Sequence, residues 1–155
     1  LYNNLEVLSS EFNNDRENIV FTENLIISIQ NFASISGDEF LFRVNMFNRN
    51  SYVPKRYRTR NLPLKIKKGY KEEDKYTIKI PKKYKLNYIP EPRTIDSKFG
   101  AYKISFEKIN DNTLVYKKQM IIKEGIYPKE DYKLYRSFRR KIAKSENLRI
   151  ALIKK

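Results

Sequence analysis

Short runs in which apolar and polar residues alternate restrict the fold of this chain more than any other feature. In residues 75–80, Tyr76, Ile78 and Ile80 fall on one side of an extended chain and charged or polar residues on the other. Residues 101–109 alternate in the same way, and 113–123 return as their partner after a turn signal. Similar short runs occupy 39–47, 62–67, 84–89 and 148–153. Strands of this kind, about ten residues apart and separated by turns, predict a mainly β chain with an antiparallel β-sandwich-like domain.

The N-terminal part of the chain is also strand-like. Residues 19–32 form a long run of branched and aromatic residues, and 39–47 alternate well. Ser36-Gly37-Asp38 lies between the two runs and provides a turn. We therefore expect a β-hairpin that pairs 19–32 with 39–47.

Near residue 128 the apolar period changes from that of a strand to that of a helix. Pro128 suits a first helical turn, and the acidic residues of 130–131 complement a helix N-terminus. One apolar stripe follows at helical spacing and consists of Tyr132, Tyr135, Phe138 and Ile142. We predict one amphipathic helix over about 128–144, closed by residues 145–147 and followed by a final strand, with the stripe packed against the sheet.

Residues 48–61 have no apolar period and carry many charges, which predicts a loop and the most mobile segment of the chain. Basic residues flank Tyr57 there, as in grooves that bind single-stranded nucleic acid, although a solvated loop has the same composition. We expect a single domain over 1–155. Because charge and composition shift at this loop, an alternative division would separate a lead-in hairpin over 1–47 from a module over 62–155.

The positive charge is unevenly distributed. Residues 1–50 contain 3 basic and 7 acidic side chains, whereas residues 51–155 contain 30 and 11. Such a field attracts anionic partners, but Lys outnumbers Arg by two to one, and Arg is preferred where phosphates or bases are recognised specifically. A compositional bias of the coding sequence also explains the charge, and we favour it over specific anion binding. The candidate anion or partner surface consists of Lys55, Arg56, Arg58, Arg60, Arg136, Arg139, Arg140 and Lys141.

The chain contains neither Cys nor His. This composition excludes a thiol nucleophile, a Cys/His zinc site and a Ser–His–Asp triad, and leaves carboxylate, Lys or Tyr chemistry. Residues 72–74 are acidic, but we interpret them as a solvated turn, and Glu91 and Asp96 show no sign of a cleft that would make them an acid–base pair. The glycines have no phosphate-loop spacing. We predict no catalytic residue, metal ligand or cofactor.

No apolar run is long enough for a membrane-spanning helix, and the first residues do not resemble a signal peptide. The sequence opens on Leu1 rather than Met, so we expect a fragment or a processed product.

Several short motifs then occur in a fixed order along the second part of the chain. They are Arg60-Asn-Leu-Pro63, Gly69-Tyr70, Asp74-Lys-Tyr-Thr-Ile-Lys-Ile-Pro81, Tyr88-Ile-Pro-Glu-Pro92, Ser97-Lys-Phe-Gly100-Ala-Tyr102, Leu114-Val-Tyr-Lys117, Gly125-Ile-Tyr-Pro-Lys-Glu-Asp-Tyr132, Phe138-Arg-Arg-Lys-Ile142 and Arg149-Ile-Ala-Leu-Ile-Lys154. This series resembles the C-terminal β domain, a domain of unknown function, of bacterial transglutaminase-like proteins. The resemblance covers about 60–155, and residues 1–59 match only in their strand-rich character.

The resemblance implies a β-sandwich-like fold with one late helix in a periplasmic or cell-envelope protein. The catalytic Cys–His–Asp residues of such proteins lie in a core before this domain, and none can be assigned here. Its structural motif residues would be Pro63, Pro90, Pro92, Phe99, Gly100, Tyr102, Tyr132, Tyr135, Phe138 and Ile142. We expect a non-catalytic accessory domain whose partner is the catalytic core of its own parent chain or an envelope protein. The alternative is a basic module that binds nucleic acid, acidic glycan or anionic lipid, with nucleic acid the less favoured partner.

Overall fold

The computed structural model describes residues 4–155. They form two compact units, one that ends at Ser34 and one that runs from Ile35 to Lys155. The division lies before the 48–61 segment, which belongs entirely to the second unit. Two compact units can still fold as one cooperative domain, so the expectation of a single domain over 1–155 stays a prediction.

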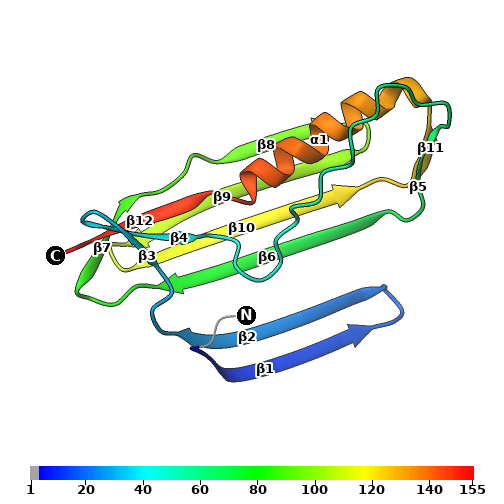
Figure 1. The fold of residues 1–155 in the computed structure, drawn as a ribbon. Coiled ribbons are helices and arrows are strands. Elements are labelled where there is room, and N and C mark those ends of the chain that lie inside the picture. Colours follow the sequence, from blue (N-terminus) through cyan, green and yellow to red (C-terminus); the bar gives the residue numbers. More distant parts are fainter. Residues whose placement is uncertain (1–3) are drawn as a thin grey trace. The chain divides into compact units, whose positions relative to one another are not determined.

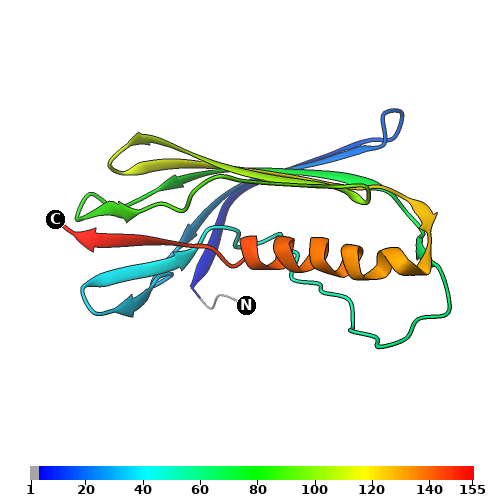
Figure 2. The same ribbon diagram turned by 90° about the horizontal axis from the view of Figure 1, so that it is seen from above.

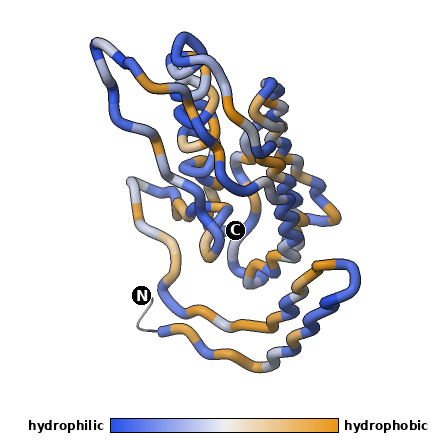
Figure 3. The backbone as a smooth tube through the Cα atoms, turned by 90° about the vertical axis from the view of Figure 1, so that its right-hand side faces the viewer, coloured by the Kyte–Doolittle hydropathy of each residue, from blue (hydrophilic) through white to orange (hydrophobic). Residues whose placement is uncertain are grey.

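The first unit is an antiparallel hairpin of β1 (Leu5–Asp15) and β2 (Val20–Ile29). The Asp15 carboxylate organises its turn by accepting hydrogen bonds from the amides of Glu17, at 3.1 Å, and Asn18, at 3.0 Å. Hydrophobic stretches run along both strands (Figure 3), yet most of their large apolar side chains are exposed, and Ile19 at the turn is 92% exposed.

The main sheet of the second unit has the strand order β6-β10-β9-β8 and is antiparallel throughout (Figure 1). Its strands are β6 (Tyr70–Lys79), β8 (Arg93–Ser97), β9 (Gly100–Asn110) and β10 (Thr113–Ile122). β9 and β10 are central, whereas β6 and β8 are the two edges of this sheet. One face of β9 and of β10 contains buried residues, whereas the corresponding positions of the edge strands β6 and β8 are half-buried, in keeping with the alternation of the sequence.

A second sheet has the order β3-β4-β12-β7. Its strands are β3 (Ser34–Ser36), β4 (Glu39–Arg43), β7 (Tyr84–Tyr88) and β12 (Arg149–Lys154). The short strands β5 (Leu64–Ile66) and β11 (Gly125–Tyr127) pair separately. A 3-10 turn, Lys129–Asp131, leads into the helix α1 (Tyr132–Ser145).

The second unit has two layers (Figure 2). The main sheet forms one layer, and α1 followed in line by β12 and its sheet forms the other. Phe99 lies between the layers, with ring centroids 5.3 Å from Tyr135 and 6.4 Å from Phe138. The core between the layers also includes Tyr102, Ile104, Leu114, Tyr116, Met120, Ile142 and Ile150, all almost fully buried.

The structure confirms the mainly β fold, the β-hairpin of residues 101–123, and the helix with its final strand. Gly100 has a φ of 146°, and a Cβ there would lie 1.9 Å from the carbonyl oxygen of Ile121, so this position requires glycine.

Three details of the strand prediction are wrong. Val20–Ile29 pairs with β1 rather than with 39–47, because the chain already reverses at the turn that Asp15 organises. Only Ser34–Ser36 pairs with β4 across Gly37. Strand β8 follows Pro92 where no strand was expected. The acidic residues 72–74 lie inside β6 and not in a turn.

Candidate functional site

The chemically most unusual side chain in the core is that of Lys118. It occupies an inward position of β10, in the register of Tyr116 and Met120, which are both buried. The Lys118 side chain is 0% exposed. A cation buried so completely is strongly destabilising unless it is paired.

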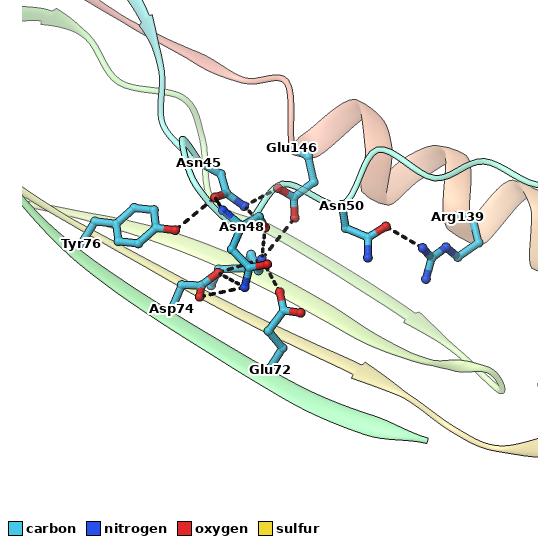
Figure 4. A network of polar contacts seen from close by, with 9 residues as sticks. Asn45, Asn48, Asn50, Glu72, Asp74, Tyr76, Arg139 and Glu146 are labelled. Carbon is cyan, nitrogen blue, oxygen red and sulfur yellow. Dashed lines mark hydrogen bonds and ion pairs between the residues drawn. The ribbon is translucent and has the colours of Figure 1, made fainter. Parts of the chain in front are cut away.

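Three oxygen atoms surround the Lys118 ammonium. They belong to Glu72, Asp74 and Asn48, which lie close together in Figure 4. The Lys118 Nζ lies 2.5 Å from Glu72 Oε1, 2.7 Å from Asp74 Oδ2 and 2.8 Å from the carbonyl oxygen of Asn48. Glu72 and Asp74 point inward from the edge strand β6, and Asp74 is directly opposite Lys118 in the sheet. The ammonium therefore has one hydrogen bond, to the Asn48 carbonyl oxygen, and close ion pairs with two carboxylates.

Glu146 brings a third carboxylate to the cluster from the other layer. It is the residue that ends α1, its side chain is fully buried, and its Oε1 lies 3.7 Å from Lys118 Nζ. Asn45 Nδ2 donates to Glu146 Oε2 at 2.5 Å and also to the carbonyl oxygen of Asn48 at 2.8 Å. We call Lys118, Glu72, Asp74, Glu146, Asn45 and Asn48 the Lys118 cluster. It joins both layers of the second unit and the loop after β4.

The electrostatics of the cluster keep Lys118 charged. Burial alone lowers its pKa, but the hydrogen bonds to Asp74 and Glu72 outweigh burial and raise the pKa above the ordinary value of lysine. Burial raises the pKa of Glu146, and the charge of Lys118 only partly opposes this effect. Lys118 is thus a protonated ion held between carboxylates, and it is neither a nucleophile nor a base in this state.

Tyrosines border the cluster. Burial is the main cause that raises the pKa of Tyr76, Tyr102 and Tyr116 well above the usual value for tyrosine, so their hydroxyls stay neutral. Tyr76 donates to Asn45 Oδ1 at 3.2 Å. In residues 4–155 no group of three acidic side chains is arranged to hold a metal ion, and the ammonium occupies the centre of the one buried acidic cluster described here.

The loop of residues 44–63 lies along α1 and is held there by side chains of the helix. Tyr132 donates to the carbonyl oxygen of Lys55 at 2.6 Å, and Arg136 Nε donates to that of Pro54 at 2.9 Å. Arg139 is only 5% exposed, and its guanidinium donates to Asn50 Oδ1 at 2.6 Å. Two of the arginines predicted for an anion surface therefore hold the loop in place.

A small pocket remains where the loop meets the start of α1. Its volume is about 250 Å³, and it is lined by Arg56, Tyr57, Tyr132, Lys133 and Arg136. We call this the Tyr57 pocket. The rings of Tyr57 and Tyr132 are 5.6 Å apart, and the Arg60 guanidinium lies 4.3 Å from the centre of the Tyr132 ring. The pocket thus combines aromatic faces with cations, which suits an aromatic or anionic group.

A second and larger groove lies between strand β8 and the end of α1. Its volume is about 380 Å³. Its lining consists of Pro92, Arg93, Thr94, Ile95, Lys141, Lys144 and Ser145, and we call it the β8 groove. Arg93 crosses it and donates from a guanidinium nitrogen to Ser145 Oγ at 3.4 Å.

The structure distributes the predicted surface residues over several places. Arg56 and Arg136 line the Tyr57 pocket, Lys141 lines the β8 groove, and Arg139 is buried. The others are Lys55, Arg58 and Arg140, which are exposed, and Arg60, which is half-buried.

The predicted structural motif residues fall into two groups. Those that are buried are Pro90, Phe99, Gly100, Tyr102, Tyr132, Phe138 and Ile142. Tyr135 is half-buried, whereas Pro63 and Pro92 are exposed.

Sequence reasoning missed the Lys118 cluster. The signal was present, because Lys118 has the parity of Leu114 and Ile122, and Glu72 and Asp74 have the parity of Tyr76 and Ile78. Charged residues at core parity on two strands that were candidates for pairing indicate a buried ion pair. The interpretation of 72–74 as a turn concealed this pattern.

No helix of residues 4–155 has both the length and the apolar character needed to cross a membrane.

Comparison with known proteins gives one match. The family described as "Domain of Unknown Function with solved-structure structure" (DUF3858) matches residues 38–152. No curated protein and no solved structure matches the chain. The family description mentions no transglutaminase-like protein, so that part of the sequence resemblance stays a prediction. Because the match spans most of the chain and nearly all of the second unit, the chain belongs to the DUF3858 family of domains of unknown function.

Proposed function

We propose that this chain is a non-catalytic accessory or interaction domain of a bacterial cell-envelope protein with a transglutaminase- or protease-like core. The observation that carries the proposal is the state of Lys118. Lys118 is the one buried lysine of residues 4–155, and its ammonium lies within 2.8 Å of three acceptor oxygens while its pKa is raised. The geometry fits a group that fixes two layers together, and does not fit one that attacks a substrate.

The surface supports an interaction role. Arg56, Lys133, Lys141 and Lys144 line two hollows and form no ion pair with a carboxylate of residues 4–155. Unpaired cations that line a hollow are available to a partner. The partner we propose is the catalytic core of the parent chain or another envelope protein. The periplasm or cell envelope is part of this proposal, and the ordered motifs of residues 60–154 are its support.

Activity measurements on the isolated chain test the proposal. We expect no release of ammonia from a glutamine peptide, no incorporation of a primary amine into it, and no hydrolysis of a peptide library. Robust turnover in any of these assays would refute the proposal, and loss of that turnover in Lys118→Met but not in Lys117→Met would assign it to Lys118. The second substitution is the matched control, because Lys117 is the next residue of β10 and points out of the core.

The alternative function is a basic module that binds anions, and the Tyr57 pocket favours it. Its cations surround two tyrosine rings, as in sites that bind single-stranded nucleic acid or phosphorylated aromatic groups. Affinity for heparin and for a single-stranded oligonucleotide should then fall log-linearly with salt. Tyr57→Ala should weaken oligonucleotide binding more than heparin binding. No binding of either polyanion at low salt would remove this alternative.

A further inference from the structure

We propose that the β8 groove binds an extended, acidic peptide segment of a partner protein as an additional strand beside β8. This inference rests on the proposed role as an interaction domain, and it identifies the surface and the chemistry of the partner. Three observations carry it: β8 is an edge strand, the groove beside it is basic, and its cations are unpaired.

The first observation is the open edge of the main sheet. β8 pairs with β9 on one side only, and in the strand order β6-β10-β9-β8 nothing follows it. In an antiparallel pair every second residue directs its amide and carbonyl away from the partner strand. β8 therefore presents a row of free backbone donors and acceptors, which is the template for strand addition.

The second observation is the charge of the groove. Arg93 projects from β8, and Lys141 and Lys144 project from the last two turns of α1. Cations near the C-terminal end of a helix interact favourably with the helix dipole, and this effect alone can explain the presence of each lysine. The dipole does not account for their convergence with an arginine from a separate strand on one groove of about 380 Å³.

The third observation is that these cations are not neutralised internally. None of Arg93, Lys141 and Lys144 forms an ion pair with a carboxylate of residues 4–155. The acids nearest to these cations in the sequence are Glu91, Asp96 and Glu146. Glu91 and Asp96 are exposed, Glu146 is buried in the Lys118 cluster, and none of the three lines the groove. The local field therefore favours an anion in the groove.

Strand geometry then defines the ligand. Side chains of an added strand alternate between its two faces, so every second residue faces the groove. Acidic residues at those positions would meet Arg93, Lys141 and Lys144, and the half-buried Ile95 gives the peptide an apolar contact. Nucleic acid and anionic lipid would use the cations but not the backbone of β8, so an acidic peptide is the ligand that uses both features.

The probe for the test is a fluorescent ten-residue peptide with alternating Glu and Val. We expect saturable binding in fluorescence anisotropy, with an affinity that decreases as salt rises. The double variant Lys141→Glu/Lys144→Glu should bind about tenfold more weakly or worse, because it reverses two groove charges. Lys67→Glu/Lys68→Glu makes the same change in net charge at exposed residues outside the groove, and it should leave the affinity within about twofold.

Backbone pairing is tested on the peptide, so that the protein stays intact. Two versions of the peptide are N-methylated, one at its odd and one at its even residues, so that each keeps its charge but loses half of its amide donors. Only one of the two sets of amides faces β8, so we expect that version alone to bind about tenfold more weakly than the unmodified peptide. Equal binding of both N-methylated peptides, or equal weakening by the two protein double variants, would refute the proposal. So would tighter binding of an oligonucleotide or of anionic vesicles at the same groove.

These outcomes are distinct from those that concern the proposed function. A chain that binds no acidic peptide and has no enzymatic turnover would refute the peptide site and leave the accessory role intact. Turnover dependent on Lys118 would refute the accessory role, whatever the peptide does.

Discussion

Replacement of Lys118 by methionine is the most informative perturbation of this fold. Methionine has a similar length and shape, so the packing around Tyr116 and Met120 is largely kept. The charge is removed, however, and Glu72, Asp74 and Glu146 lose the cation that lies within 2.5–3.7 Å of them.

The expected cost follows from the geometry. Removing one partner of a buried ion pair typically costs about 3–5 kcal/mol, because the remaining charge stays buried and uncompensated. Glu146 is fully buried, and Asp74 is largely so, so we place the loss at about 4 kcal/mol at pH 7. A domain of this size is stable by about 5–15 kcal/mol in total, so the variant is expected to fold but with a much lower unfolding midpoint.

Urea denaturation followed by far-UV circular dichroism measures this loss, since the chain has no Trp for fluorescence. Lys117→Met is the control. Lys117 is half exposed and pairs with Glu107 only at 3.5 Å, so it should lose less than about 1 kcal/mol. The difference in the free energy of unfolding between Lys118→Met and Lys117→Met should become smaller as the pH falls from 7 toward 4, because protonation removes the uncompensated charge of the buried carboxylates. Equal stability of the two variants at pH 7 would refute the argument for a buried ion cluster.

Three further predictions concern other positions. Burial raises the pKa of Glu146 above its ordinary value of 4.5, so the native state binds this proton more tightly than the unfolded state does. The free energy of unfolding of the wild type should therefore fall as the pH rises from 4.5 through the raised pKa. Glu146→Gln should lack this loss, which urea titrations at several pH values measure. Gly100→Ala places a Cβ against the Ile121 carbonyl oxygen and should lower the unfolding midpoint by more than any exposed substitution, a result that a calorimetric scan checks. Tyr132→Phe removes the 2.6 Å hydrogen bond to the carbonyl oxygen of Lys55 and should lower the free energy of unfolding by about 1 kcal/mol. Trypsin should then cleave the 44–63 loop faster, and an unchanged cleavage rate would contradict the role of this bond.

The sequence predicted the regions where local pattern and burial agree. The alternation of Tyr102, Ile104 and Phe106 identified β9, and the stripe from Tyr132 to Ile142 identified α1 with its buried face. In both cases the apolar period alone determines the element, because one face has to be removed from water.

The missed features depend on partners that are remote in the sequence. β8 has a polar composition, and it becomes a strand because the turn at Lys98-Phe99 aligns it with β9. Lys118 is tolerable in the core only because carboxylates from β6 and from the end of α1 reach it. Neither circumstance is visible in a window of neighbouring residues.

The position of β12 in the second sheet has a consequence for how the chain acquires its structure during synthesis. β12 pairs with β4 on one side and with β7 on the other, although both precede it by about 60 residues or more. While the ribosome is making residues 89–148, β4 and β7 are separate strands with no neighbour between them. This layer therefore closes only after residues 149–154 have been made, and a product truncated before them would leave two unpaired strand edges open to self-association.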